Sequence, residues 1–600
     1  MSNIIIFDFE VFRYDSLLGA IVLSEKGQEL FQTWNEVEIR HFYTTHQDDI
    51  WIGHNNFKYD DIILETIING GSAYKTSKNI VNGTHFYKPK LKLYSYDIMC
   101  INKSPFSLKL TELIVGKNIH TTDVDFDIDR PLSDEEKKLT EDYNADDLYQ
   151  TLYNYNMFYN QFKLRLDIIK EFNLDLQSSL RATGTALAAK VLGSKRNEAL
   201  KYDKIWPKLY DTLQLKNEDL KQYFLNEDFR TGKSIIVNIA GADITIAAGG
   251  AHSAIKKYYT SKFLYFDVSG YYNLIMINYN LLPRTMPAES KEKYTYMYHE
   301  QLKLKKINPV KRNMYKTILL SVFGAMNNEY TDFYDPWKAL LVTTTGELFI
   351  CDLLEKLDGL IRVIQTNTDG IMVEPLDWNN EQKIIEIVEE WEKRTGFVIK
   401  KEHKYDLWQR DVNCYILRDD KGNLEYKGDI FKNYIIDEAT YSSGNIFECK
   451  EPSIIAKGVV NYLMFDKTPE ETVEEYKTDL SLFQYACKKK TYDYTSYDVF
   501  SIEKNEKNKT NLILQSSERL QGIDRAFAWN KPGVIGMVYK HKTDKKSGKV
   551  KYDKVANLPN SVFIYNYDLK DAYDKIADQI DYSYYSDRIY ERIAELVEVS

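Results

Sequence analysis

The fold of this chain is constrained most by short apolar runs that contain an acidic residue near their end or in the turn that follows them. Asn3–Phe9 holds three consecutive isoleucines, and Phe263–Val268 is a second run of the same kind. β-Branched and aromatic side chains suit a buried, pleated strand, so both runs predict buried β-strands. Arg362–Thr366 and Ile371–Glu374 are two more, and the polar turn Asn367–Gly370 between them predicts a β-hairpin with a carboxylate at its tip.

Helical segments stand between these strands. Residues 133–160 begin with an N-cap serine and first-turn acids and continue with helical apolar spacing. A second, alanine-rich helix is predicted around Gln177–Leu192. Residues 291–324 predict a helical hairpin that turns at Asn308-Pro309 and is ended by Gly324.

Length and composition bound the class of protein. Six hundred residues exceed one hydrophobic core, so about two to four domains are expected. The net charge of −10 weakens long-range attraction to nucleic acid without excluding local cationic contacts. No apolar run approaches the ~20 residues that span a bilayer, and the N-terminus lacks the basic region of a signal peptide, so a soluble intracellular protein is expected. The five cysteines form no C-x-x-C pair, which argues against a zinc site and a disulfide framework.

The first acidic group is predicted from strand geometry. Asp8 and Glu10 stand two apart on the first strand, so both carboxylates face one side of it. Two later segments, His54–Asp60 and Tyr143–Asp147, each place an acid at a fixed distance from an asparagine or a tyrosine. Carboxylates are hard oxygen ligands of the kind that divalent ions prefer, so these acids are candidate metal ligands.

The second acidic group combines a strand end, a helix and the hairpin tip. Asp267 lies at the end of the second apolar strand, and Asp369 lies in the hairpin turn. On the intervening helix, Arg312 and Lys316 share a face at a spacing of four residues, which gathers two cations on one side of the helix.

In this order the segments resemble the motifs of family B DNA polymerases that carry a 3′→5′ exonuclease. The exonuclease patterns D-x-E, N-x(2–3)-[FY]-D and Y-x(3)-D match Phe7–Glu10, His54–Asp60 and Tyr143–Asp147, and Ser107-Leu108-Lys109 also fits that domain. The polymerase patterns D-x-x-S-L-Y-P-S-I, K-x(3)-N-S-x-Y-G and Y-G-D-T-D-S match Asp267–Ile275, Lys316–Gly324 and Gln365–Gly370.

The resemblance implies a mixed α/β and α+β multidomain fold, in which a ribonuclease-H-like exonuclease domain precedes a right-hand polymerase with palm, fingers and thumb. The implied regions are 1–165 for the exonuclease domain, 166–262 for a linker and N-terminal palm region, 263–290 for the first part of the palm, 291–324 for the fingers hairpin, 325–450 for the second part of the palm, and 451–600 for the thumb and C-terminal region. It also implies Mg²⁺ or Mn²⁺ as the cofactor, with two ions in each active site.

For the exonuclease, the implied metal ligands are Asp8, Glu10, Asp60 and Asp147. Tyr143 would orient the attacking water. Either Asn55 or Asn56 would hold the displaced primer end, because the motif spacing fits both. Asp146 competes with Asp147 for the last ligand position, although the family's tyrosine spacing favours Asp147.

For the polymerase, the implied metal ligands are Asp267, the Val268 carbonyl and Asp369. The residues expected at the incoming nucleotide are Arg312, Lys316, Tyr272, Ser321 and Gly324. Tyr272 would lie under the sugar and exclude a 2′-hydroxyl. The chain departs from the family's Asn, Tyr and first Asp at Leu320, Phe323 and Asn367.

Further positions expected to contact DNA are Gly249, Gly250, Tyr415, Lys427, Lys545 and Lys546. Gly249 and Gly250 fall where the family contacts the template. Tyr415 and Lys427 fall where the palm of the family holds the primer terminus. The last two lie within the basic stretch Lys540–Lys554, which would grip the duplex backbone as part of the thumb.

The expected function is template-directed DNA synthesis with 3′→5′ proofreading. Its partners would be primer–template DNA, deoxynucleoside triphosphates and replication accessory proteins. The closest resemblance is to compact bacteriophage polymerases, so we expect a monomer without a membrane partner, in the host cytoplasm if a phage encodes it. The short interval between Asp267 and Lys316 leaves little room for the insertion of protein-primed enzymes, which favours a nucleic-acid primer.

Two other functions stay open. A stand-alone 3′→5′ exonuclease with a degenerate polymerase half is motivated by Leu320 and Asn367. A non-catalytic DNA-binding replication scaffold would bind DNA without metal-dependent turnover, and the two sets of carboxylates argue against it. Primer extension distinguishes these alternatives.

Overall fold

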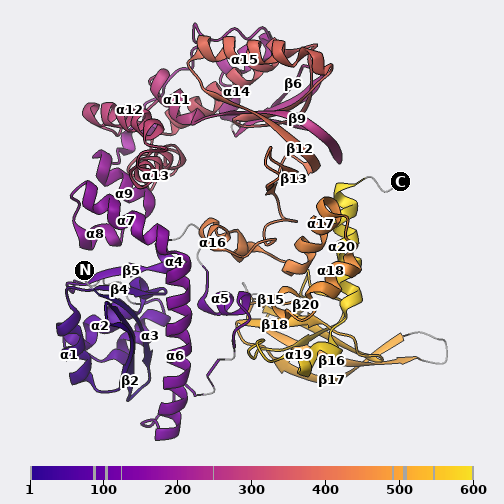
Figure 1. Cartoon of the computed structure of the whole chain (residues 1–600). Coiled ribbons are helices and arrows are strands. Elements are labelled where there is room, and N and C mark those ends of the chain that lie inside the picture. Colours follow the sequence, from indigo (N-terminus) through magenta and orange to yellow (C-terminus); the bar gives the residue numbers. More distant parts are fainter. Residues whose placement is uncertain are drawn as a thin grey trace. The chain divides into compact units, whose positions relative to one another are not determined.

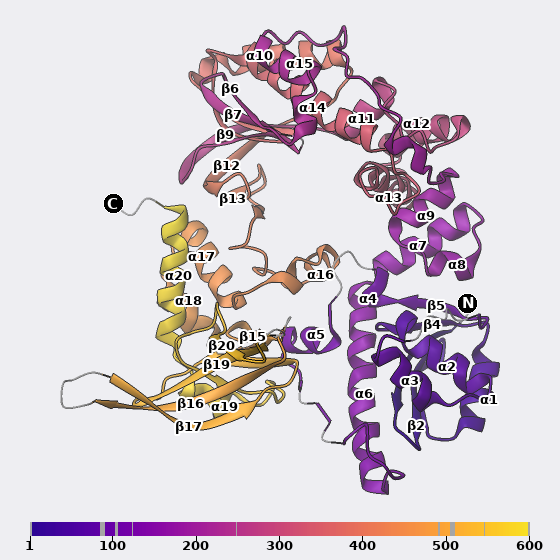
Figure 2. The same cartoon turned by 180° about the vertical axis from the view of Figure 1, so that it is seen from behind.

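The computed structural model describes residues 3–84, 90–101, 106–119, 121–122, 124–247, 249–489, 492–504, 510–544 and 547–597. The mixed α/β chain divides into two compact units, each assembled from segments that are remote in sequence (Figure 1; Figure 2). The first unit comprises 1–166, 175–181 and 432–592, and the second comprises 167–174, 182–431 and 593–600. Within the described ranges, no helix has the length and apolar character needed to cross a membrane.

The N-terminal part of the first unit is a five-stranded sheet in the order β3-β2-β1-β4-β5. Its strands are β1 (Ile4–Val11), β2 (Ser16–Ser24), β3 (Gly27–Thr33), β4 (Ile50–Gly53) and β5 (Tyr94–Asp97). The first three form an antiparallel meander, whereas β4 runs parallel to β1 and β5 runs parallel to β4. β1 is therefore central, as its isoleucines predict, and Phe7 packs edge-on against Trp51 with 5.1 Å between ring centroids.

Helices accompany this sheet: α1 (Glu36–His46), α2 (Asp60–Ile68), α3 (Ala73–Val81), α4 (Ile98–Ile101), α5 (Leu108–Ile114), α6 (Asp134–Met157) and α8 (Leu176–Leu180). α6 is the helix predicted over 133–160. Its capping box is complete, because the side chains of Ser133 and Glu136 each accept from the other's backbone N–H. α6 packs against β1 and β2, which brings its acidic segment to the strand that carries Asp8.

The C-terminal segment 432–592 belongs to the same unit. Its helices are α16 (Glu438–Ser443), α17 (Ser453–Phe465), α18 (Pro469–Tyr476), α19 (Tyr573–Ile576) and α20 (Tyr582–Leu596), the last of which crosses the unit boundary. Its strands form the sheets β15-β18-β21 and β17-β16-β19-β20. They are β15 (Tyr485–Lys488), β16 (Tyr494–Lys504), β17 (Thr510–Arg519), β18 (Ile523–Ala528), β19 (Val534–Thr543), β20 (Val550–Lys554) and β21 (Val562–Ile564). The buried Arg525 donates to the carbonyl oxygens of Lys117 and Tyr567, both at 2.6 Å, and so ties β18 to the segment after α5.

The second unit is built on a nine-stranded antiparallel sheet in the order β14-β13-β12-β9-β11-β10-β8-β7-β6. Its strands are β6 (Ile235–Ile239), β7 (Ala242–Ala247), β8 (Gly250–Ala254), β9 (Tyr258–Val268), β10 (Ile361–Asn367), β11 (Gly370–Pro375), β12 (Ile399–Asp411), β13 (Cys414–Arg418) and β14 (Leu424–Lys427). The predicted apolar strand is β9, and the predicted hairpin is β10–β11. β11 pairs with both β9 and β10, so the end of β9 meets the hairpin turn.

The helices of the second unit are α9 (Gly184–Leu192), α10 (Glu218–Leu225), α11 (Tyr271–Asn278), α12 (Ala288–Lys303), α13 (Pro309–Ala325), α14 (Pro336–Leu357) and α15 (Glu381–Thr395), and α7 (Tyr159–Glu171) crosses the unit boundary. The predicted helical hairpin is α12–α13. Asn308 caps α13 by accepting from the Lys311 N–H at 3.0 Å. The prediction that Gly324 ends this helix is wrong, because Gly324 lacks left-handed backbone and the helix continues to Ala325.

The single helix predicted around Gln177–Leu192 is also wrong, since the segment forms two helices, α8 and α9. Asp175 and Thr183 each cap a separate helix start by accepting from a backbone N–H three residues later. Between them, Arg181 forms an ion pair with the fully buried Asp61. A buried carboxylate needs a partner, and this long-range contact overrides the helical propensity of the segment.

Candidate active sites

The first candidate site lies where β1 meets α6 in the first unit. Ligand oxygens of Asp8, Glu10 and Asp147 lie within 4.8 Å of one another. Asp8 and Glu10 share one face of β1, and Asp147 comes from α6. Asp60, the first residue of α2, accepts a 3.0 Å hydrogen bond from the Phe9 N–H, which places it beside the same strand. Four acids predicted from three separate segments thus lie on or beside one strand.

Acidic side chains outnumber basic ones in this cluster. The pKa of Asp8 is raised to about 8, mainly because the carboxyl is buried and secondly because Asp147 is close. The pKa values of Glu10 and Asp60 both lie well above the usual range, mainly because the carboxyls are buried and secondly because Asp8 is close. Lys109 supplies a cation, with its Nζ 2.9 Å from Asp147 Oδ1. A buried, crowded set of carboxyl oxygens fits hard divalent cations such as Mg²⁺ or Mn²⁺, which would take the place of the protons that the raised pKa values retain.

Tyr143 lies on α6 one turn before Asp147, and Lys109 Nζ lies 4.6 Å from the centroid of its ring. Burial, followed by Asp147, raises the pKa of Tyr143, so its hydroxyl remains a hydrogen-bond donor at neutral pH. Asp146 is exposed, whereas Asp147 is buried and belongs to the acid cluster. Of the two alternatives, the structure brings Asp147 to the site.

The two candidate asparagines have different environments. Asn56 is fully buried, and its amide donates to Asp61 at 3.0 Å and to Ser95 at 2.7 Å. Asn55 is half-buried with a left-handed φ of 66°, and its backbone N–H donates to Asp97 at 3.1 Å. Asn56 therefore serves the core, whereas the Asn55 side chain remains partly accessible.

Sequence reasoning missed a residue that positions the acid cluster. The Asn144 amide donates to Asp8 Oδ2 at 2.9 Å, and its own oxygen accepts from Gln32 at 3.1 Å. A Cβ at Gly19, which pairs with Asp8 across β1 and β2, would lie 1.8 Å from Asn144 Oδ1. Asn144 immediately follows Tyr143 in the third motif, and that adjacency was the signal that could have identified it.

The second candidate site lies at the end of β9 in the second unit. Gly370 is the cross-strand partner of Asp267, and the Val268 N–H donates to the Asp369 carbonyl at 2.8 Å. The backbones of the two predicted aspartates are therefore neighbours. Burial, followed by Asp267, raises the pKa of Asp369. Thr368, with a φ of 58°, takes the left-handed conformation in the two-residue turn.

A row of paired residues crosses the sheet through this turn. It runs Lys400, Asp267, Gly370, Asn367, His252 and Thr245. Lys400 Nζ lies 3.0 Å from Asp267 Oδ2. Neither Lys400 nor His252 was predicted, because the pattern of a single strand does not give its register against another.

Gly250 supports the turn from β8. Its φ is 140°, and a Cβ there would lie 3.0 Å from both His252 Nε2 and Thr368 Oγ1, whereas a Cβ at Gly249 would have no atom within 4 Å. Glu347 of α14 is 2% exposed and accepts from the Gly250 N–H, and among the described residues its Oε1 has no hydrogen-bond partner. Burial raises the pKa of Glu347 to about 8, so this carboxyl holds its proton at neutral pH.

The residues predicted to bind the nucleotide lie on α11 and α13. Tyr272 stacks on Phe323 with ring centroids 4.1 Å apart, so the departure from tyrosine at 323 keeps an aromatic partner. The Ser321 hydroxyl donates to the Thr317 carbonyl at 2.8 Å. A Cβ at Gly324 would have no atom within 4 Å, which leaves that side of α13 open.

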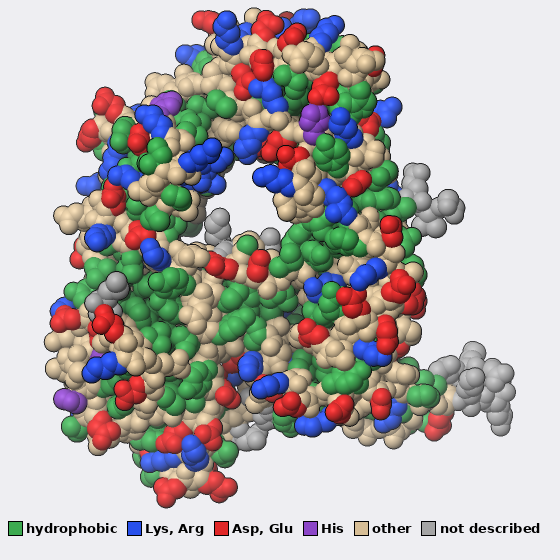
Figure 3. All heavy atoms as spheres, viewed as in Figure 1, with side chains coloured by type: hydrophobic (Ala, Val, Ile, Leu, Met, Phe, Trp, Pro, Cys, Tyr) green, Lys and Arg blue, Asp and Glu red, His purple; other side chains and the backbone are tan. Residues whose placement is uncertain are grey.

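Lys and Arg side chains lie over the α12–α13 hairpin (Figure 3). Arg312 and Lys316 belong to one face of α13 and form no ion pair with a described residue. Leu320 continues that face and is 57% exposed. The departure from asparagine at 320 thus leaves an exposed apolar side chain beside the two cations.

The remaining predicted DNA contacts are distributed over both units. Tyr415 of β13 and Lys427 of β14 are cross-strand partners, and Lys427 acts to lower the pKa of Asp369, against the effect of burial. The basic stretch Lys540–Lys554 forms part of β19 and β20, a paired hairpin in the first unit. Lys545 and Lys546 lie outside the described residues.

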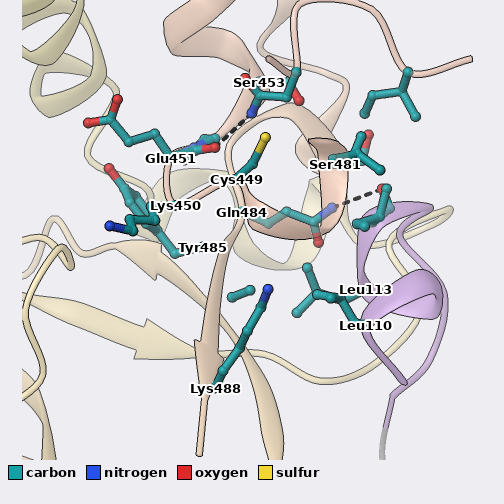
Figure 4. A pocket seen from close by; sticks show the side chains of 16 residues that line it. Leu110, Leu113, Cys449, Lys450, Glu451, Ser453, Ser481, Gln484, Tyr485 and Lys488 are labelled. Atoms are coloured by element: carbon teal, nitrogen blue, oxygen red, sulfur yellow. Dashed lines mark hydrogen bonds between the residues drawn. The ribbon is translucent and has the colours of Figure 1, made fainter. Parts of the chain in front are cut away.

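A small cavity of about 50 Å³ lies between α5 and the C-terminal segment of the first unit (Figure 4). The Gln484 amide in its wall donates to the Ile114 carbonyl at 3.2 Å, and the Gln484 oxygen accepts from Arg525 at 2.7 Å. The volume suits a few water molecules and falls well below the roughly 300 Å³ of a ligand pocket. We assign no ligand to this cavity.

No protein-family model matches the chain, and no curated protein matches it. Among solved structures, one that is similar is the family B DNA polymerase from the hyperthermophilic archaeon Pyrobaculum calidifontis, with a TM-score of 0.45 and 14% sequence identity. The match covers 100% of this chain and 78% of that polymerase chain.

Proposed function

We propose that the chain is a DNA-directed DNA polymerase with 3′→5′ exodeoxyribonuclease activity, of the compact bacteriophage type. One observation carries this proposal: motif segments remote in sequence converge on two separate carboxylate sites. Asp8, Glu10 and Asp147 gather in the first unit, and Asp267 and Asp369 have neighbouring backbones in the second. A scaffold protein without turnover has no use for two such sites.

In the proposed exonuclease, the ligands of two Mg²⁺ or Mn²⁺ ions are Asp8, Glu10, Asp60 and Asp147. Tyr143 keeps its proton and donates a hydrogen bond that orients the attacking water. Asn55 holds the displaced primer end, because the amide of Asn56 is already used in the core. Asn144 positions Asp8.

In the proposed polymerase, Asp267, the Val268 carbonyl and Asp369 hold the ions. When bound, divalent ions in both sites stabilise negative charge on the reacting phosphate and its oxygens. Arg312 and Lys316 neutralise the incoming triphosphate. Tyr272, braced by the Phe323 ring, lies under the sugar and excludes a 2′-hydroxyl.

The other residues assigned to nucleotide or DNA are Ser321, Gly324, Gly249, Gly250, Tyr415, Lys427, Lys545 and Lys546. Ser321 and Gly324 shape the pocket of the nascent base pair, and the glycines approach the template. Positioning the primer 3′ oxygen in line with the α-phosphate is then the main task of the chain. We propose that the protein works as a monomer in the cytoplasm on a nucleic-acid primer.

A labelled primer–template with Mg²⁺, with and without deoxynucleoside triphosphates, tests the proposal. Asp8→Ala is expected to abolish degradation and spare extension, and Asp369→Ala is expected to do the reverse. Degradation without any Asp369-dependent extension would instead identify a stand-alone exonuclease, which the exposed Leu320 and the uncharged Asn367 favour. DNA binding with neither activity would identify a replication scaffold.

A further inference from the structure

A cation that the proposed function does not use contacts the proposed polymerase site. Lys400 Nζ lies 3.0 Å from Asp267 Oδ2. The Lys400 side chain is 55% exposed and that of Asp267 is 23% exposed. The ammonium therefore engages, from a solvent-accessible position, an oxygen that a divalent ion would need as a ligand.

Strand register puts the lysine there. Lys400 on β12 lies directly opposite Asp267 on β9, and directly opposed residues of antiparallel strands project to the same face of a sheet. The next residue, Lys401, lies opposite Phe266, projects to the other face and pairs with Glu392 of α15. The fold thus supplies a positive charge beside Asp267 and a matched lysine on the opposite face.

The site carries little net negative charge for the binding of two divalent ions. Asp267 and Asp369 are acidic, whereas Asn367 in the same row of the sheet adds no charge. Burial raises the pKa of Asp369 most strongly, and the positive charges of Lys427 and Lys400 act to lower it. Two lysines therefore oppose two aspartates before metal or nucleotide binds.

We propose that Lys400 is a built-in counter-ion of Asp267 that competes with divalent ions for this carboxylate. The proposal rests on the polymerase function proposed above. In the nucleotide-free protein the ammonium occupies Asp267 Oδ2, so an ion has to displace it. The polyanionic triphosphate of an incoming nucleotide offers the displaced ammonium a new partner, so ions and nucleotide bind better together than ions bind alone. Lys400 is thus a positioning residue that sets metal affinity.

Mn²⁺ binding to the full chain tests this proposal, with free Mn²⁺ measured by electron paramagnetic resonance in the absence of nucleotide. All variants carry Asp8→Ala and Glu10→Ala, which remove ligands of the exonuclease cluster. Lys400→Met is expected to tighten Mn²⁺ binding about twofold to fivefold, the upper part of the range for losing a partly exposed ion pair. Lys400→Arg is expected to stay close to the parent affinity. Lys401→Met removes the same formal charge on the other face and is expected to change the affinity by less than about twofold.

Unchanged Mn²⁺ affinity in Lys400→Met, or equal tightening in Lys401→Met, overturns the counter-ion proposal. Asp267→Asn distinguishes this from failure of the proposed function. Loss of a Mn²⁺ site in Asp267→Asn identifies Asp267 as a ligand, so a null result at Lys400 then concerns the counter-ion alone. Mn²⁺ binding that is insensitive to Asp267→Asn overturns the proposed polymerase metal site itself.

Discussion

The backbone N–H of Val268 donates a 2.8 Å hydrogen bond to the carbonyl oxygen of Asp369. This bond joins the end of β9 to the β10–β11 turn, and Gly370 pairs opposite Asp267 in the adjacent register. The main chain therefore holds the two aspartates together. Substitutions that move this main chain should impair synthesis even when they leave both carboxylates in place.

Gly250→Ala is expected to lower the rate of primer extension at least about tenfold and to spare exonuclease activity. The backbone at φ 140° is strained for alanine, at a cost of roughly 1–3 kcal/mol, and the new Cβ would press on His252 and Thr368 beside the turn. Single-nucleotide incorporation and degradation rates measured on the same preparations check this. Gly184→Ala, where a Cβ meets nothing within 4 Å and to which no DNA contact is assigned, is the control and should extend primers within about twofold of wild type. Equal incorporation rates in the two variants would contradict the expectation.

Gly19→Ala is expected to slow degradation of a single-stranded 3′ end by at least about tenfold while primer extension continues. A Cβ placed 1.8 Å from Asn144 Oδ1 forces that amide away from Asp8, and small misplacements of catalytic groups carry large rate penalties. Hydrolysis of a labelled oligonucleotide measures the effect. Gly184→Ala, with no atom within 4 Å of its Cβ, should degrade DNA at the wild-type rate. A fully active Gly19→Ala enzyme would show that Asn144 does not position Asp8.

Substitutions of the two neighbouring asparagines should have different effects, one on stability and the other on exonuclease activity. Asn56→Ala removes a buried amide from Asp61 and Ser95 and is expected to lower the free energy of unfolding by about 1–3 kcal/mol. Asn55→Gly keeps the left-handed backbone, so unfolding should change by less than about 0.5 kcal/mol while degradation slows. Urea denaturation and exonuclease assays of both variants decide the matter. The opposite pattern would assign the ligand contact to Asn56.

The buried Glu347 should make stability depend on pH. Its pKa is raised by burial from the ordinary value of 4.5 to about 8, so between these values the folded protein holds a proton that the unfolded chain has released. The stabilisation is therefore complete below the unfolded pKa and is lost as the pH rises through the folded one. Relative to Glu347→Gln, wild type should lose on the order of a few kcal/mol between about pH 5 and pH 9, measured by denaturant unfolding. A difference that does not vary with pH would contradict a protonated Glu347.

Local pattern is enough to predict most of the elements that carry the acids, although not α2, which carries Asp60. β1, β9 and the β10–β11 hairpin follow from short apolar runs and turn residues, and the start of α6 follows from Ser133 and Glu136. These signals are short-range, because strand alternation, turns and helix caps depend on residues a few positions apart. The order of the acidic motifs along the chain then indicates two separate sites.

Packing between distant segments decides the rest. Arg181 breaks a predicted helix because Asp61 needs a partner, and burial distinguishes Asn56 from Asn55 and Asp147 from Asp146. The pairing of Lys400 with Asp267 depends on the register between β12 and β9. Neither register nor burial can be derived from one segment alone, since both arise from contacts between parts of the chain that are far apart in sequence.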